Sequence, residues 1–326
     1  PCAAEKLIYG RKIRKTQIEK PPVFVIGHWR SGTTLLHNAL SKDPRFGHVS
    51  LFQTLMPGSF LVGRRTLQPL LALRAPNTRP MDNVKIRMPY PSEEEYALSH
   101  TCRQSLYIGF NFPQDWPDLF EKYALMNGIS DEERAEWVRA YREIVVKATI
   151  NAPGRRIVLK NPVNTARIRA VREAFPGAKF VHIYRTPHDV YRSTLHLYRE
   201  VFKVTALQCI TEERIQQYVL ELYPRVMNAY WEQREELPEG DHVEMRYEDF
   251  VQSPVREIER MYRALDLGDF EPARRPIERF LGARAKFQPH EYARDPAERE
   301  LVERDWRDAL DRAGYAGNRP EEIVTA

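Results

Sequence analysis

The segment from residue 23 to residue 34 constrains the fold more than any other part of this chain. An apolar, β-branched run at residues 23–26 is followed by a loop with glycines at positions 27 and 32, and then by a helical pattern. A strand, a glycine-bounded loop and a helix in this order form an anion cradle, because backbone N–H groups and the positive end of the helix dipole converge on one phosphate-sized site. The segment predicts an α/β fold with an anionic ligand.

The position of the cation distinguishes this loop from a P-loop. The spacing from Gly27 to Gly32 matches, but Thr33 stands where a Walker A motif needs Lys, and the positive charge is on Arg30, inside the loop. An ordinary glycine turn and a degenerate nucleoside-triphosphate site are two interpretations of this pattern. A loop for a different phosphorylated donor is the third.

The loop resembles that of a known family. Residues 30–34, Arg-Ser-Gly-Thr-Thr, are similar at every position to the 5′-phosphosulfate loop of sulfotransferases that use 3′-phosphoadenosine-5′-phosphosulfate (PAPS). The similarity is greatest to the broad group that acts on lipid, sugar or tyrosyl hydroxyls. The resemblance implies a set of residues that bind the 5′-phosphosulfate: Arg30, Ser31, Gly32, Thr33 and Thr34.

A second motif supports the resemblance. In the family a strand-end Arg and a Ser eight residues later grip the 3′-phosphate of the donor, and Arg185 and Ser193 resemble this pair. A guanidinium and a hydroxyl are suitable partners for phosphate oxygens. Each residue alone could be an ordinary surface side chain. The two motifs in the expected order favour the family.

Other parts of the chain extend the match from about residue 21 to residue 267. The segment 158–162 resembles the family's central strand end, which implies that Lys160 lies near the transferred group. The segment 246–250 resembles the one whose Tyr approaches the adenine, here Tyr247, although a core tyrosine is the other interpretation. Residues 282–286 are a candidate for the loop that closes over the donor.

Cations gather where the predicted sheet would bind a ligand. Strands are predicted at residues 156–160, 179–184 and 242–247, and their alternation with helices predicts a parallel sheet. Lys160 and Arg185 then lie at carboxyl ends, where such sheets bind ligands. No acidic residue ends the first three strands to hold a metal, so the donor's charge is expected to be neutralised by side chains without a metal ion.

Two helices and one irregular insertion are also predicted. Residues 130–133 form a capping box that opens a helix to about Ile150, and a long amphipathic helix is expected from Thr211 to Glu235. The insertion from Leu51 to Trp116 is rich in aromatic residues. These predict either an apolar or aromatic acceptor site or part of the core.

The catalytic base is where the chain departs from its better-known relatives. Cytosolic-type sulfotransferases place a His two residues after the central Lys, and here that position is Pro162. An acid from the run Glu93-Glu94-Glu95 is therefore expected to take the acceptor proton. Glu95 is the first choice, Glu94 the second and Glu93 the third. If Ser92 caps the helix, Glu95 would instead complete a capping box; His28 and His37 are further alternatives.

Net charge and cysteine content indicate which partners and which cellular compartment to expect. The net charge of +5 and the pI near 9.0 favour anionic partners, but Lys and Arg are interleaved with Asp and Glu, so no nucleic-acid surface is expected. The three scattered cysteines, Cys2, Cys102 and Cys209, are typical of a reducing compartment, which predicts a cytoplasmic protein. Because the chain begins at Pro1, an upstream segment could have been removed.

The N-terminal residues are the one locally basic stretch. Residues 5–20 are expected to form a short helix that docks on the domain through one side, or that rests on an anionic membrane surface. That docking side would contain Leu7, Ile8, Ile13 and Ile18. We expect residues 1–20 to be an N-terminal basic segment and residues 21–326 to be a single sulfotransferase domain.

The predicted fold is thus one α/β domain with a mostly parallel central sheet flanked by helices, related to P-loop kinases. The predicted activity is transfer of a sulfuryl group from PAPS to an acceptor hydroxyl, with Arg30 and Lys160 offsetting charge on the bridging oxygen. A P-loop nucleotide kinase and a non-catalytic nucleotide-binding protein are the alternatives.

Overall fold

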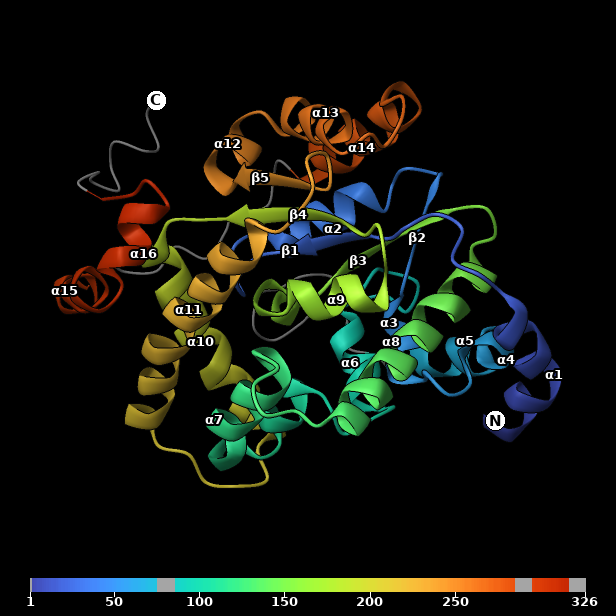
Figure 1. Ribbon diagram of the computed structural model, residues 1–326, viewed down its shortest axis with the longest axis horizontal. Coiled ribbons are helices and arrows are strands. Elements are labelled where there is room, and N and C mark those ends of the chain that lie inside the picture. The colour runs from blue at the N-terminus through green and yellow to red at the C-terminus, as the bar shows by residue number, and fades with distance from the viewer. Residues whose placement is uncertain (1, 75–85, 285–294, 317–326) are drawn as a thin grey trace.

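A five-stranded, fully parallel sheet forms the centre of the computed structural model, which describes residues 2–74, 86–284 and 295–316. The strand order is β2-β3-β1-β4-β5 (Figure 1). The strands are β1 (Val23–Ile26), β2 (Phe46–His48), β3 (Arg156–Lys160), β4 (Lys179–Tyr184) and β5 (His242–Arg246). Four of them were predicted, and the predicted fold class is confirmed. The sequence did not reveal β2, because three residues with a central glycine carry no strand pattern.

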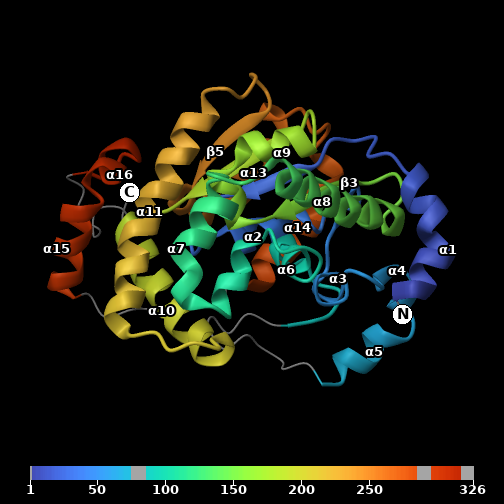
Figure 2. The ribbon, with the colours of Figure 1, turned by 60° about the horizontal axis from the view of Figure 1, so that its bottom comes forward.

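Helices cover both faces of the sheet (Figures 1 and 2). Alternate residues of β1 face opposite sides, since successive strand side chains point to opposite faces. Phe24 and Ile26 pack on the layer that contains α8 to α11, whereas Val23 and Val25 pack on the layer of α2, α13 and α14. These helices are α2 (Thr33–Leu40), α8 (Asp131–Asn151), α9 (Ile168–Ala174), α10 (Pro187–Thr205), α11 (Glu212–Arg234), α13 (Pro254–Ala264) and α14 (Glu271–Arg284).

Shorter elements surround this core. They are α1 (Cys2–Lys15), α3 (Leu51–Leu55), α4 (Phe60–Gly63), α5 (Leu67–Ala72), α6 (Glu94–Ser99), α7 (Trp116–Leu119), α12 (Tyr247–Gln252), α15 (Pro296–Asp305), α16 (Arg307–Arg312), the 3-10 helices η1 (Leu106–Phe110), η2 (Pro113–Asp115) and η4 (Pro162–Ala166), and the π-helical turn η3 (Phe120–Ala124).

The two predicted long helices are confirmed, together with the cap of the first. Ser130 and Glu133 form the expected capping box at the start of α8, with hydrogen bonds of 3.2 and 3.0 Å. Thr211 caps α11 through a bond to the Arg214 amide. Both caps satisfy backbone donors that have no partner inside a helix.

The aromatic insertion mostly builds core. A first group is buried: Phe52, Phe60, Tyr107, Phe110 and Trp116. A second group is more than a third exposed, at 38%, 37% and 39% respectively: Tyr90, Tyr96 and Phe112. The core interpretation therefore holds for the first group, and the second remains available to a ligand.

The N-terminal helix α1 docks through a side that the sequence did not indicate. Leu7 and Ile8 are 87% and 65% exposed, so their expected docking is wrong. Ile13 is half-buried, and Ile18, which follows the helix, packs against the core as expected. The buried residue of α1 is Glu5, which pairs with Lys147 of α8 and accepts from the Leu61 amide of α4. The boundary between residues 1–20 and 21–326 stays a prediction. Among the described residues, no helix combines the length and apolar character of a membrane span.

Candidate active site

The donor loop joins β1 to α2, and its glycines allow two close approaches. Gly27 has φ +142°, and a Cβ there would lie 2.1 Å from the Ile183 carbonyl oxygen of β4. Gly32 has φ +95° and precedes α2; a Cβ there would lie 2.4 Å from the ring of Tyr247. Both positions therefore require glycine, because no other residue fits the space or the backbone angle.

Arg30, in the first predicted donor motif, contacts the second motif. It adopts φ +72°, an uncommon angle for a residue with a side chain, which often marks functional loops. Its Nε donates a 2.7 Å hydrogen bond to Oγ of Ser193 on α10. The loop after β1 and the helix after β4 thus meet at this contact, across 163 residues of sequence. Ser31 and Thr33 are buried beside it, and Thr34 is half-buried in the first turn of α2.

Arg185 directly follows the last residue of β4. Its guanidinium lies 4.7 Å from the centre of the Tyr247 ring and pairs with Asp189 at 2.8 Å. Its Nε is a buried donor with no hydrogen-bond partner. An oxygen-rich anion would satisfy that donor, since leaving a buried donor unpaired costs free energy. Tyr247 therefore contacts both donor motifs, through the Gly32 backbone and through Arg185.

A second group of site residues surrounds the ion pair of Lys160 with Glu93. Lys160, the last residue of β3, is 2% exposed, and its Nζ forms an ion pair with Oε1 of Glu93. Oε2 of Glu93 accepts a hydrogen bond from the hydroxyl of Tyr107. That hydroxyl in turn accepts from Nε1 of Trp29, in the donor loop, at 3.2 Å. A continuous chain of hydrogen bonds thus connects the loop to the carboxylate.

Burial explains the state of Tyr107. Its pKa is well above the usual value because burial and then the neighbouring Glu93 carboxylate disfavour the phenolate. Tyr107 therefore keeps its proton and remains a donor to Glu93.

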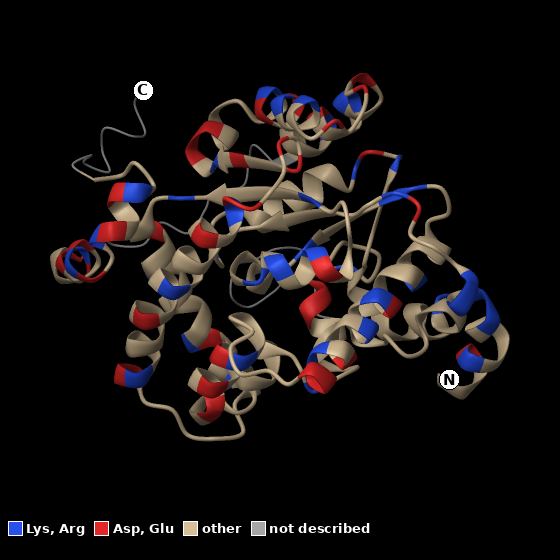
Figure 3. Cartoon of the chain, viewed as in Figure 1, with Lys and Arg blue, Asp and Glu red and all other residues tan. Residues whose placement is uncertain are grey.

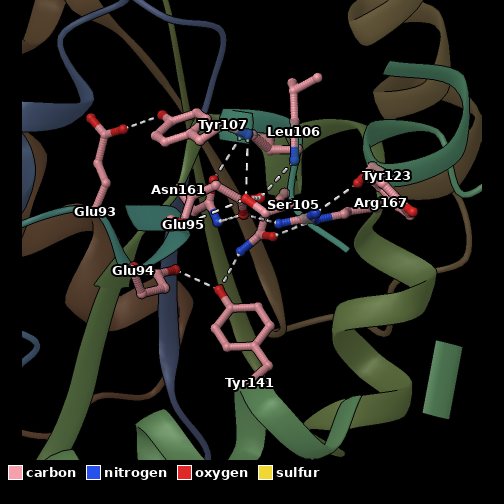
Figure 4. Close-up of polar contacts among 12 residues, drawn as sticks. Glu93, Glu94, Glu95, Ser105, Leu106, Tyr107, Tyr123, Tyr141, Asn161 and Arg167 are labelled. Atoms are coloured by element: carbon pink, nitrogen blue, oxygen red, sulfur yellow. Dashed lines mark hydrogen bonds and ion pairs between the residues drawn. The ribbon is translucent and has the colours of Figure 1, made fainter. Parts of the chain in front are cut away.

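Glu94 and Glu95 belong to a buried polar network with Tyr141 and Arg167, whereas Glu93 reaches Tyr107 (Figure 4). Glu94 accepts from the Tyr141 hydroxyl at 2.5 Å and from the Lys160 amide at 3.1 Å. Burial raises its pKa to about 7. Glu95 has no exposed surface and forms an ion pair with Arg167, which is equally buried.

Further donors complete the environment of Glu95. Asn161 donates to Oε2 at 2.7 Å, while the Ser105 hydroxyl and the Leu106 amide donate to Oε1 at 2.7 and 3.2 Å. The conditional cap by Ser92 does not form, because Glu93 is the N-cap residue of α6 and its side chain makes no cap bond. Both carboxylate oxygens of Glu95 are therefore occupied, whereas Glu93, whose side chain is 14% exposed, pairs with Lys160.

The two histidines considered as alternatives are both buried. Burial lowers the pKa of His28 to about 4, and its Nδ1 lies 3.0 Å from the Trp29 carbonyl oxygen. Burial also lowers the pKa of His37, whose Nε2 lies 3.3 Å from the Val158 carbonyl oxygen. Within the described residues, no group of three His, Cys, Asp or Glu side chains is arranged to hold a metal ion.

Sequence reasoning missed three residues of this arrangement. Tyr107 donates to Glu93 and accepts from Trp29, and Thr165 accepts a 2.8 Å bond from the Gly27 amide. Trp29 lies inside the recognised loop, which was a usable signal. Nothing in the sequence relates Tyr107 to residue 93, since the pairing depends on tertiary contacts. The candidate closing loop at 282–286 ends outside the described residues.

A family model and two named relatives match most of this chain. The model of the family described as "Sulfotransferase family" matches residues 21–272. Omega-hydroxy-beta-dihydromenaquinone-9 sulfotransferase Stf3 of Mycobacterium bovis is 32% identical over 97% of this chain and 81% of its own length. The protein of the same name from Mycobacterium tuberculosis matches equally.

Two solved structures share the fold. Sulfotransferase STF9 from Mycobacterium avium aligns with a TM-score of 0.77 and 16% identity, covering 95% of this chain and 81% of that one. Sulfotransferase STF1 from Mycobacterium tuberculosis aligns with a TM-score of 0.65 and 16% identity, covering 97% and 81%. The family match does not favour the nucleotide kinase or the non-catalytic alternative. The chain belongs to the sulfotransferase family and is an enzyme that transfers a sulfuryl group.

Proposed function

We propose that this sulfotransferase uses PAPS as its donor and a hydroxyl on an apolar molecule as its acceptor. The observation that carries the donor assignment is the 2.7 Å bond from Arg30 to Ser193, which brings two anion-binding motifs to one place. The unpartnered Nε of Arg185 supports it, because this buried donor suits a phosphate oxygen.

Each part of the PAPS molecule has residues suited to bind it. Arg30, together with the backbone amides and hydroxyls at the start of α2, would hold the 5′-phosphosulfate. Arg185 and Ser193 would hold the 3′-phosphate. Tyr247, which packs on Arg185 and on the Gly32 backbone, would contact the adenine. Bound there, PAPS supplies an electrophilic sulfuryl group with a phosphate as leaving group, and no metal ion is needed in this proposal.

For the base we propose Glu93 rather than the first-choice Glu95. Glu93 would accept the proton of the acceptor hydroxyl as the hydroxyl oxygen bonds to sulfur and the bond from sulfur to the bridging oxygen breaks. The ion pair with Lys160 supports this role, because it keeps a carboxylate beside a cation that can offset charge on the bridging oxygen. Glu95 has its oxygens occupied by Arg167 and three further donors.

For the acceptor we propose a lipid-like alcohol. Tyr96 is 37% exposed and its ring centre lies 4.8 Å from that of Tyr107, so an aromatic surface lies beside the proposed base. The relative at 32% identity bears the name of a hydroxylated menaquinone sulfotransferase, which favours an acceptor with a long apolar body. We also propose that residues 21–326 form one sulfotransferase domain, which the family match to residues 21–272 supports.

Ligand-dependent melting tests the donor proposal. The donor product, adenosine 3′,5′-bisphosphate (PAP), should raise the melting temperature in the presence of a chelator, since a ligand that binds only the native state stabilises it. Arg185→Ala should reduce the preference for PAP over adenosine 5′-phosphate, because a charge-assisted phosphate contact contributes roughly 1.5–3 kcal/mol. Arg192→Ala, which removes an α10 guanidinium paired with Glu298 of α15, is the matched control. An undiminished preference in Arg185→Ala would contradict the assignment.

A further inference from the structure

One end of the molecule has exposed apolar residues within a basic surface. Helices α1, α4 and α5 lie together at this end in both views (Figures 1 and 2). Five of the large apolar side chains that are exposed among the described residues belong to α1, α3 and the α5 region: Leu7 (87%), Ile8 (65%), Leu55 (42%), Leu70 (61%) and Leu73 (83%). Below, α1 and residues 51–74, which contain α3, α4 and α5, are called the N-terminal end surface.

The charge on this surface has one sign. Helix α1 has a single acidic residue, Glu5, and residues 51–74 contain none. The exposed basic residues of these segments are Lys6, Arg11, Lys12, Arg14, Lys15, Arg64, Arg65 and Arg74. In Figure 3, the blue of Lys and Arg covers much of α1, at the right of the view. Elsewhere the charges alternate in sign, so this concentration is local.

Because Glu5 is buried in an ion pair, the charged residues left on the surface of α1 are all basic. The same pair turns the Glu5 side of the helix toward the protein. Oε1 of Glu5 lies 3.0 Å from Nζ of Lys147, and Oε2 accepts from the amides of Leu61 and Val62 at 2.7 and 3.3 Å. The one carboxylate of α1 is thus taken out of the surface. Lys147 also pairs with Glu143, an exposed acid of α8.

Helical geometry then places apolar and basic residues together on the outer side. With Glu5 facing inward and about 100° per residue, Leu7, Arg11 and Arg14 fall on the opposite side of α1. Ile8 and Lys15 lie next to them, seven residues apart on one edge. Apolar side chains among Lys and Arg are the combination by which amphipathic helices lie in the interface of an anionic bilayer.

We propose that the N-terminal end surface docks the enzyme on a membrane that contains anionic phospholipid. The leucines and isoleucine would enter the headgroup region while the basic side chains contact lipid phosphates. The surface is connected to the catalytic half of the molecule, since α3 packs against α6, whose N-cap residue is Glu93. The proposal does not depend on the identity of the acceptor or of the base.

Vesicle co-sedimentation tests the proposal. The protein should bind mixed phosphatidylcholine–phosphatidylglycerol vesicles, bind pure phosphatidylcholine weakly, and dissociate as salt is added. Each Lys or Arg near such a surface changes binding about five-fold, so the triple variant Arg11→Glu, Arg14→Glu, Lys15→Glu should bind on the order of a hundred-fold more weakly.

The chain offers matched controls for charge and for apolar surface. Arg256→Glu, Arg275→Glu, Arg279→Glu makes the same change in net charge at exposed positions of α13 and α14, and should retain most binding. Leu7→Ser with Ile8→Ser should weaken binding, whereas Val204→Ser with Leu207→Ser, at positions 77% and 73% exposed, should not. Unchanged circular dichroism and melting temperature would show that every variant is folded.

Three results would overturn the proposal. The first is equal binding to neutral and anionic vesicles, or none to either. The second is an equal loss of binding in the control triple variant, which would indicate only net charge. The third is a wild-type dimer in sedimentation velocity that Leu7→Ser with Ile8→Ser dissociates, which would identify a second copy of the chain as the occupant.

Discussion

Glu93, Glu94 and Glu95 are adjacent in the sequence, yet each carboxylate has different partners. The chain enters α6 at Glu94, so successive side chains point in different directions. One carboxylate pairs with Lys160 Nζ, the next with Tyr141 and the third with Arg167. Their chemistry therefore differs although their residue type does not.

Replacing each acid by glutamine should separate catalysis from stability. Glu93→Gln should lower turnover by roughly 10² to 10⁴ because it removes the proposed base, while PAP affinity measured by calorimetry stays unchanged. Glu95→Gln should instead lower the free energy of unfolding by about 3–5 kcal/mol, since Arg167 would be left as an uncompensated buried charge. Normal turnover in Glu93→Gln with a large loss in folded Glu95→Gln would return the assignment to Glu95.

Tyr107 should act as a positioning residue for Glu93. Tyr107→Phe removes a donor to the carboxylate and so favours its protonated form, which should move the acidic limb of the pH profile of kcat to higher pH. Tyr141→Phe, which removes the donor to Glu94 instead, is the matched control and should leave that limb in place. A uniform loss of kcat without a shift would mean that Tyr107 only supports the fold.

Glu94 should make stability depend on pH. Its folded-state pKa, about 7, lies above the ordinary value of 4.5, so the folded protein holds this proton more tightly than the unfolded chain does. Its contribution is complete below the ordinary value and is lost as the pH rises through about 7, a change on the order of 3 kcal/mol. Urea unfolding of the wild type and Glu94→Gln at several pH values checks this. A difference between the two proteins that is constant with pH would contradict it.

At the scale of elements, the local sequence pattern was enough to predict those helices and turns whose structure depends on residues of one segment. The turn from β1 into α2 and the capped helix α8 were both predictable, because glycine, cap and apolar positions lie within a few residues of each other. The short strand β2 was not, and α1 docks through Glu5, whose burial depends on Lys147 from a distant helix. Such pairings become visible only when the elements are packed.

The donor loop should tolerate no side chain at its second glycine. Gly32→Ala places a Cβ 2.4 Å from the Tyr247 ring and imposes φ +95° on alanine, so it should reduce both stability and PAP affinity. Gly154→Ala, at φ +73° with no atom within 4 Å, is the control for backbone strain alone. Thermal unfolding should show a loss of roughly 1–3 kcal/mol beyond that control. Equal losses would mean that the tyrosine contact is unimportant.

At the scale of the whole molecule, the order of motifs predicted the fold, which is confirmed, and the donor residues, which stay a prediction. The sequence could not distinguish the surroundings of the three carboxylates. Arg30, Lys160 and Arg185 each end or follow a strand, and parallel strands bring their carboxyl ends to one edge. The orientation of α6 over that edge depends on Tyr107, Tyr141 and the buried pair of Arg167 with Glu95. No local pattern encodes those contacts.

Product analysis tests the central claim most directly. The purified protein should be incubated with PAPS, a chelator and a panel of long-chain and isoprenoid alcohols, and the products measured by mass spectrometry. We predict that one sulfuryl group is added to an apolar alcohol, that PAP forms in equal amount, and that the Glu93→Gln variant binds PAP but forms almost no product. Transfer of a phosphoryl group from ATP with magnesium, and no sulfuryl transfer from PAPS to any hydroxyl, would contradict the account.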